Sequence, residues 1–181
     1  MKLPIHPQYR KSSWLTKPLN SGNLRHWLID NGSLTARLKA CYADFSVRPV
    51  LLKDGRAFTD ESKLLGMKVS QRALIREVVL IGNNQPVVFA HSVLPYASLR
   101  GAWRGLGKLG NQPLGAALFA NAKVKRTPLE YKKLPCHHPI SIRAAEHASN
   151  VPIVLWARRS VFQLNCAKIL VTEVFLEQLI K

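Results

Sequence analysis

Two charged residues stand within stretches that otherwise have the composition of buried β-strands. Glu173 lies in the β-branched, apolar stretch 169–176, and Arg76 lies in the similar stretch 74–81. Because side chains alternate between the two faces of a strand, each charge points the same way as several large apolar side chains. Burying an unpaired charge costs several kcal/mol, so each group must be paired or must face a lined cavity.

The pair admits two interpretations. In the simpler one, Glu173 and Arg76 neutralise each other or reach the edge of the sheet. In the other, both face one cavity, where the guanidinium of Arg76 binds an anion and the carboxylate of Glu173 takes part in proton chemistry. The two strands alone do not decide between these hypotheses.

Two backbone positions fit the second interpretation. Ser33 has the character of a helix N-cap and Pro113 suits the start of a helix, so Leu34 and Leu114 both fall in a first helical turn. The N–H groups of a first turn have no intrahelical partner, and the helix dipole favours an anion there. Solvent that satisfies both N–H groups is the simpler alternative.

Other polar groups are weaker candidates. His91 shares strand parity with apolar neighbours, and a hydrogen-bonded core histidine is the commoner explanation of such a position. Arg158 and Arg159 are adjacent in a strand, so we expect one in solvent and the other on the inner face of the sheet. The Cys-His-His run at 136–138 has no second cluster at ligand spacing, and we therefore expect no metal and no cofactor.

Hydrophobic periodicity and turn residues predict the elements that carry these groups. We expect strands at 45–52, 73–81, 87–94, 153–164 and 167–176, two short helices within 24–41, and helices at 97–109 and 114–119. Between them we expect a turn at 53–56, a loop at 59–68, an extended segment at 122–134 and, at 136–150, a loop with at most one helical turn. Strands joined by short turns, with helices grouped between them, indicate an α+β fold on one antiparallel sheet. A basic, proline-punctuated arm over residues 1–22 precedes a single domain over residues 23–181.

The charge balance is the least ordinary property of the composition. The 181 residues include 27 Lys and Arg against 10 Asp and Glu, a formal net charge of +17, and 47% of them are hydrophobic. Such a chain can bury a core, and its basic surface attracts nucleic acid, anionic lipid or a small polyanionic substrate. No apolar run is long enough to span a bilayer, and three scattered cysteines indicate no disulfide framework, so we expect a cytoplasmic protein.

Several short motifs occur in the order in which they occur in the chorismate lyase (chorismate–pyruvate lyase) family, and the chain resembles that family from about residue 24 to residue 176. Residues 108–119 resemble its K-L-G-x-x-P-L-G-x-x-L-F signature, residues 75–80 its L-R-E-I-x-L strand, residues 90–95 the strand that follows, residues 155–160 its L-W-G-R-R-S segment, residues 172–176 its closing T-E-L-F-L and, more weakly, residues 33–35 its S-M-T segment.

The resemblance implies an enzyme that splits chorismate into 4-hydroxybenzoate and pyruvate without a cofactor, at the first committed step of ubiquinone biosynthesis. It also implies helices that cover an internal ligand cavity on the antiparallel sheet. The resemblance further implies roles for single residues of this sequence. The ring carboxylate would be held by Arg76 and by the backbone at Leu34 and Leu114. Glu173 would contact the ring hydroxyl, either as a base or as an orienting group. The family usually has arginine where His91 stands, which makes His91 a further candidate for contact with the substrate. Residues 137–150 look like an insertion.

Two other functions remain open on the sequence alone. The same fold serves as a ligand-sensing domain in some transcription regulators, so an aromatic-acid sensor is the main alternative; the lack of a DNA-binding domain in these 181 residues counts against it. A nucleic-acid binder would use the basic surface, but the paired aromatic and basic residues of an RNA-binding sheet are absent. We expect a monomer whose small-molecule partners are chorismate and 4-hydroxybenzoate.

Overall fold

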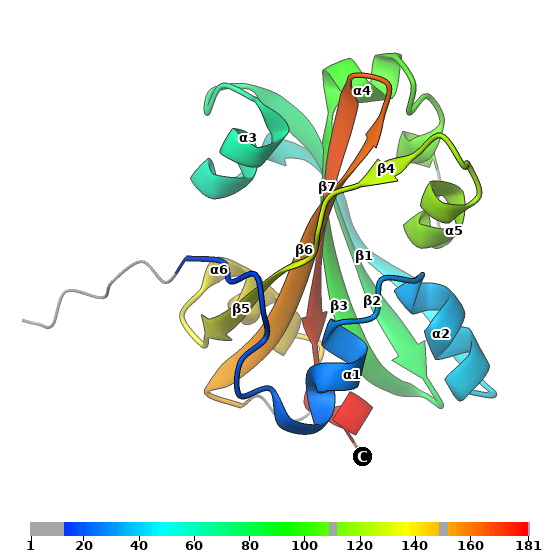
Figure 1. Cartoon of the computed structure of the whole chain (residues 1–181), viewed down its shortest axis with the longest axis vertical. Coiled ribbons are helices and arrows are strands. Elements are labelled where there is room, and N and C mark those ends of the chain that lie inside the picture. Colours follow the sequence, from blue (N-terminus) through cyan, green and yellow to red (C-terminus); the bar gives the residue numbers. More distant parts are fainter. Residues whose placement is uncertain (1–12, 109–111, 149–151, 181) are drawn as a thin grey trace, which may run out of the picture.

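One antiparallel sheet forms the centre of the α+β fold that the sequence predicts. The computed structural model describes residues 13–108, 112–148 and 152–180 (Figure 1). In these ranges the strands are β1 (Phe45–Arg56), β2 (Arg72–Gly82), β3 (Gln85–Pro95), β4 (Lys125–Arg126), β5 (Glu130–Pro135), β6 (Val154–Leu164) and β7 (Ala167–Phe175). Their order across the sheet is β1-β2-β3-β7-β6-β4, and β5 also pairs with β6.

Two β-hairpins bring the candidate charges to the same face. Arg76 in β2 lies opposite Ser92 in β3, and Ser92 lies opposite Val171 in β7. Glu173 is two residues beyond Val171, and residues two apart in a strand share a face. Because β7 inserts between β3 and β6, residues nearly one hundred positions apart in the chain meet on one surface of the sheet.

Short helices cover both faces of the sheet. They are η1 (Gly22–Leu24), α1 (Arg25–Leu28), α2 (Leu34–Cys41), α3 (Thr59–Leu65), α4 (Tyr96–Arg100), η2 (Leu106–Lys108), α5 (Leu114–Phe119), α6 (Pro139–Ala145) and η3 (Glu177–Ile180). Figure 1 shows α2 and α5 together on one side of the sheet, and α3 and α6 on the other. The sheet therefore has two covered faces, which we call the cavity face (under α2 and α5) and the far face (under α3 and α6).

Alternate residues of the central strands build a separate core on each face. Val78 and Leu80 pack with Leu38 of α2 on the cavity face. Val79 and Phe89 belong to a second cluster on the far face, which includes residues of α6. Burial on both sides explains why β2, β3 and β7 are apolar almost throughout instead of alternating with polar residues.

Several predicted elements are confirmed, and those that differ have local causes. The helices at 34–41 and 114–119 and both central hairpins form as expected. The predicted turn at 53–56 is wrong, because these residues continue β1 by pairing with residues 72–75 of β2.

The predicted loop at 59–68 is also wrong, since it contains α3. The carboxylate of Glu61 starts this helix by accepting a hydrogen bond from the N–H of Phe58 at 2.9 Å. The predicted loop at 136–150 contains the seven-residue helix α6, which is longer than the single helical turn expected there. The last two residues of this segment lie outside the described ranges.

The predicted helix at 97–109 is wrong in its length. It ends at Arg100, because the backbone leaves the helical region at Gly101, which has φ −102° and ψ −125°. Gly105, with a φ of +99°, is a second position incompatible with a right-handed helix. Residue 109 and the following break at 110–111 lie outside the described residues.

Of the predicted arm at 1–22, residues 1–12 lie outside the described residues as well. The part that follows is anchored on the sheet. Leu15 forms a β-bridge with Tyr131 in β5. The indole of Trp14 donates a hydrogen bond to Asp60 at 3.1 Å and lies under the guanidinium of Arg159, 4.0 Å from ring centroid to carbon.

Candidate active site

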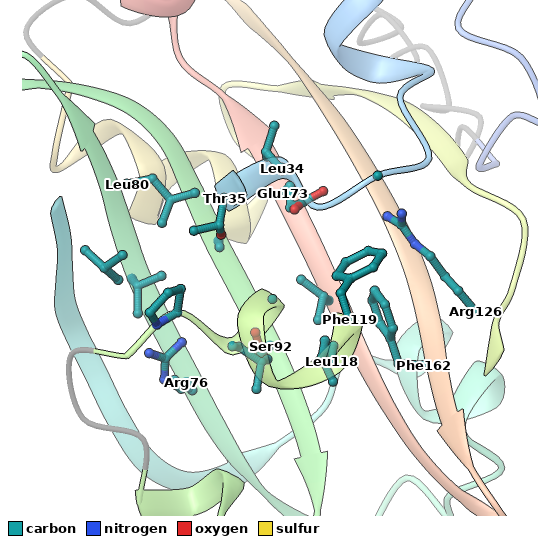
Figure 2. A pocket seen from close by; sticks show the side chains of 18 residues that line it. Leu34, Thr35, Arg76, Leu80, Ser92, Leu118, Phe119, Arg126, Phe162 and Glu173 are labelled. Carbon is teal, nitrogen blue, oxygen red and sulfur yellow. The ribbon is translucent and has the colours of Figure 1, made fainter. Parts of the chain in front are cut away.

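A cavity lies between the cavity face of the sheet and the two helices α2 and α5. The volume open to the centre of a water-sized sphere is about 40 Å³. The lining is mostly apolar with a few polar groups, the usual composition of a small-molecule site. It consists of Gly32, Leu34, Thr35, Val47, Arg76, Val78, Leu80, Ala90, Ser92, Pro113, Leu114, Gly115, Leu118, Phe119, Arg126, Phe162, Val171 and Glu173 (Figure 2).

Arg76 supplies a positive charge at one side of this cavity. Its side chain is 4% exposed, and one terminal nitrogen donates a hydrogen bond to the carbonyl of Gln112 at 2.9 Å. That carbonyl belongs to the segment immediately before α5, so the guanidinium is oriented by the covering helix as well as by the strand. Burial lowers the pKa of Arg76. A buried guanidinium is well suited to bidentate binding of a carboxylate.

Glu173 lies in the same cavity, held by a different arginine. The Nε of Arg158, directly opposite in β6, donates a hydrogen bond to its Oε2 at 2.6 Å. Arg158 is fully buried, and its Nη1 donates to the carbonyls of Trp27, Leu28 and Asp30 at 2.7–3.2 Å. The ion pair therefore fixes Glu173 and ties it to the end of α1, next to the start of α2.

The starts of the two covering helices meet at the cavity. The hydroxyl of Ser33 caps α2 by accepting a hydrogen bond from the N–H of Ala36 at 3.3 Å, and Pro113 precedes the first residue of α5. A Cβ added to Gly115 would lie 3.4 Å from the Ser33 hydroxyl and from the Thr35 hydroxyl. The first turns of both helices, with Leu34 and Leu114, thus point their backbone N–H ends toward one region.

His91 does not lie with these groups. Its neighbours Ala90 and Ser92 line the cavity, so alternation turns His91 to the far face. There its Nδ1 is 2.9 Å from Glu77 and its Nε2 is 3.4 Å from Glu61. The structure brings Arg76, Glu173, Leu34 and Leu114 to one cavity and leaves His91 outside it.

The far-face histidine belongs to a closed network of charges. Arg143 of α6 makes an ion pair with Glu77 and also donates to it from Nε, at 2.6 and 2.8 Å to the two oxygens. Burial opposes protonation of His91, but the carboxylates of Glu61 and Glu77 outweigh it and raise its pKa to about 9. His91 is thus a core histidine that is hydrogen-bonded through Nδ1 to Glu77, while its Nε2 faces Glu61 without a hydrogen bond among the described residues.

The expectation that one of the adjacent arginines at 158 and 159 is solvated is wrong. Both are buried, Arg158 against Glu173 on the cavity face and Arg159 against Glu130 and Asp60 on the other. The sequence carried a signal for the first pair. A tight turn at 165–166 in the closing hairpin places residue 158 opposite residue 173 when positions are counted outward from it.

The Cys-His-His run at 136–138 has a local role. His138 is the N-cap of α6, and its Nδ1 accepts a hydrogen bond from the N–H of Ile140 at 3.2 Å. Among the residues described, no group of three or more His, Cys, Asp or Glu side chains gathers as a metal site would require. No helix in the described ranges is long and apolar enough to cross a membrane.

Comparison with known sequences gives consistent results. The family model described as chorismate lyase matches residues 11–181. A probable chorismate pyruvate-lyase of Nitrosomonas europaea is 47% identical over 165 residues, which cover 91% of this chain and 93% of the relative. A second protein of that name, from Thiobacillus denitrificans, is 47% identical over 157 residues, covering 87% of this chain and 84% of the relative.

Solved structures with a similar fold are more distant in sequence. PhnF from Mycobacterium smegmatis superposes with a TM-score of 0.55 at 18% identity, over 83% of this chain and 66% of PhnF. A GntR-family transcriptional regulator from Bacillus cereus also gives 0.55, at 13% identity, over 74% of this chain and 92% of that protein. At these identities the likeness shows the fold alone.

Proposed function

Because this chain belongs to the chorismate lyase family and is a lyase, we propose that its cavity binds chorismate and that Arg76 and Glu173 act on it there. The observation that carries the assignment of residues is their shared cavity. Arg76 from β2 and Glu173 from β7 line the same enclosed space, together with the first residues of α2 and α5.

In this proposal Arg76 and the backbone N–H groups of Leu34 and Leu114 hold the ring carboxylate. Support comes from three groups of positive character that line the same cavity: a desolvated guanidinium and the first residues of two helices. Glu173 then lies at the other end of the ring, beside the hydroxyl. The apolar walls between the two ends suit a six-membered carbon ring.

The reaction is an elimination in which the ring becomes aromatic. The bond between the ring carbon and the ether oxygen breaks, and the proton on the neighbouring hydroxyl-bearing carbon is lost. The products are 4-hydroxybenzoate and enolpyruvate, which takes up a proton on carbon and becomes pyruvate. Glu173 either abstracts the ring proton or orients the hydroxyl. The enzyme mainly holds the dianion in a reactive conformation away from water.

Arg158 supports Glu173 in either role. Its 2.6 Å contact leaves the second carboxylate oxygen of Glu173 for the ligand, and its three backbone acceptors keep the guanidinium from rotating away. A fixed carboxylate loses little conformational entropy when the substrate binds, which is the benefit of preorganisation.

The decisive test is incubation of the purified protein with chorismate. We expect 4-hydroxybenzoate and pyruvate to appear in equal amounts, in the presence or absence of a chelator, because the reaction as proposed needs no cofactor. Formation of neither product would refute the activity. We place the reaction in the cytoplasm, at the first committed step of ubiquinone biosynthesis.

A second candidate is an aromatic-acid sensor, favoured by the fold alone. A solved structure described as the effector domain of PhnF has a TM-score of 0.54 at 18% identity, over 81% of this chain and 90% of that domain. A sensor would bind 4-hydroxybenzoate and leave chorismate unchanged, so the same incubation, with product binding measured alongside, distinguishes the two functions.

A further inference from the structure

Arg126 is a second cation at the cavity, on the side away from Arg76. It lies in β4 opposite Phe162 of β6, and its Nε donates to the hydroxyl of Ser160 at 2.7 Å. Its Nη1 donates to the carbonyl of Asn31 at 3.0 Å, just before α2 begins. These two bonds fix the head of a long side chain that would otherwise sample many rotamers.

The position of this head relates it to Glu173. Figure 2 shows Arg126 reaching toward the cavity from the side opposite Arg76, with its guanidinium directed toward Glu173. Glu173 is already paired with Arg158 at 2.6 Å. Within the described residues Arg126 makes no ion pair, and its hydrogen bonds run from Nε and Nη1, which leaves Nη2 for a ligand.

The surroundings of Arg126 favour an anion. Burial lowers the pKa of Arg126, and Glu173 acts in the opposite direction. Its guanidinium carbon is 5.1 Å from the ring centroid of Phe162 and 5.7 Å from that of Phe119. A guanidinium that has lost water and lies against aromatic rings gains more from a carboxylate than one in solvent does.

We propose that Arg126 forms a second carboxylate subsite, which binds the side-chain carboxylate of a substrate whose ring carboxylate is held by Arg76. This inference rests on the proposed function. Chorismate carries its second carboxylate on the enolpyruvyl ether, attached to the ring carbon next to the one that bears the hydroxyl. With the hydroxyl at Glu173, that carboxylate falls at the Arg126 end of the cavity.

The subsite has a consequence for substrate and product. Chorismate contacts both arginines, whereas 4-hydroxybenzoate has a single carboxylate and contacts Arg76 alone. Arg126 therefore contributes to recognition of the substrate and to holding the departing enolpyruvate, and contributes little to the affinity for the aromatic product. It also links the bound side chain to the start of α2 through the Asn31 carbonyl.

The test uses two ligands that differ only in the second charge: 3-(carboxymethoxy)benzoate and its neutral isostere 3-(carbamoylmethoxy)benzoate. Calorimetry on the wild-type protein should show a preference for the carboxylate of about tenfold or more. In Arg126→Gln the preference should fall below about threefold, while Lys125→Gln, which removes an exposed charge from the next position of the same strand, should keep it.

Turnover gives a second, independent readout. In Arg126→Gln the KM for chorismate should rise about tenfold or more, while the Kd for 4-hydroxybenzoate stays within about threefold of the wild-type value. An equal loss of affinity for 4-hydroxybenzoate would mean that Arg126 only supports the loop at Asn31, and would overturn the subsite. So would an undiminished preference for the dicarboxylate.

If Arg126→Gln does not fold, Arg126→Lys decides with the same ligand pair. It keeps the charge, so a carboxylate preference above about threefold supports the subsite and a lower one refutes it. The proposed function fails separately. If the wild-type protein shows the Arg126-dependent preference but does not consume chorismate, the subsite stands and the proposed reaction is refuted. If it consumes chorismate but shows no such preference, the reaction stands and the subsite is refuted.

Discussion

The two faces of β2 and β3 carry charged residues at adjacent positions and use them differently. On the cavity face, Arg76 lines a space beside Ser92; on the far face, Glu77 and His91 bind each other and are covered by α3 and α6. Burial does not distinguish the faces, since Arg76 is 4% exposed and Glu77 is 1% exposed. The faces differ in the space beside the charge, which protein side chains fill on the far face and leave open on the cavity face.

A buried charge is therefore a guide to function only together with the volume next to it. The far-face network has two carboxylates facing one histidine and one arginine, a balanced set. The cavity has Glu173 bound to Arg158, with Arg76 and Arg126 as further cations. The excess of positive charge at the cavity matches a dianionic ligand. We therefore expect mutations on the cavity face to change catalysis and mutations on the far face to change stability.

The largest expected effect is on the turnover of Glu173→Gln. This change keeps the shape of the side chain and removes its charge. If Glu173 abstracts the ring proton, kcat should fall by roughly 10²–10⁴ while 4-hydroxybenzoate still binds. A much smaller loss would assign it the orienting role. Glu177→Gln, at an exposed carboxylate four residues along, is the control and should turn over normally.

Arg76→Ala should weaken binding of 4-hydroxybenzoate by about 2–5 kcal/mol, because the ligand carboxylate is left without its charged partner. Fluorescence or calorimetric titration would measure the loss. Arg72→Ala removes a solvent-exposed arginine of the same strand and should leave the affinity within about twofold. If Arg76→Ala unfolds the protein instead, Arg76 is a structural group and the proposed anchor is wrong.

On the far face, His91→Gln should lower the free energy of unfolding by roughly 1–3 kcal/mol and leave KM unchanged. The pH dependence of the free energy of unfolding tests the same contribution of His91 in the wild-type protein. Binding in the network raises the pKa of His91 from 6.5 to about 9, so its contribution is complete below pH 6.5 and is lost as the pH rises through 9. Urea unfolding at pH 6 and pH 9.5 should show this loss in the wild-type protein and a smaller one in the variant. A changed KM would place His91 in the site after all.

The smallest expected effect concerns the Cys-His-His run. A triple variant with Cys136→Ser, His137→Ala and His138→Asn should keep its kcat, and exhaustive chelation should not alter the wild-type rate. Asparagine at 138 retains a side-chain acceptor for the start of α6, which separates loss of the N-cap from loss of a ligand. Activity that disappears with chelator and returns with one metal would contradict the cofactor-independent reaction.

The sequence predicts well what depends on neighbouring residues. Ser33 and Pro113 define the first turns of α2 and α5 because capping is local chemistry. The central hairpins follow from apolar runs bounded by turn residues. By contrast, Asp54 and Gly55 have turn composition but continue β1, because pairing with β2 outweighs local propensity.

Contacts between distant elements account for what the sequence could not predict. Arg126 and Asn31 are 95 positions apart, and no spacing rule connects them. Glu77 stands beside Arg76 in the sequence, yet its charged partners, His91 and Arg143, come from β3 and α6. Its role is visible only when those elements are placed. Pairs within one hairpin, such as Arg158 with Glu173, are intermediate between local contacts and contacts of distant elements. They can be predicted from the sequence once the turn of the hairpin has been located.

The central place of β7 affects how a newly made chain must fold. This strand is synthesised after all the others, yet it lies between β3 and β6 and bears Glu173. Until it emerges, the edge of β3 and much apolar surface on both faces stay exposed, a state prone to pair with other nascent chains. Completion of the sheet depends on contacts between residues far apart in the chain, which slows folding. We therefore expect the cavity to be complete only after β7 has been synthesised, and chains that end before β7 to bind no ligand.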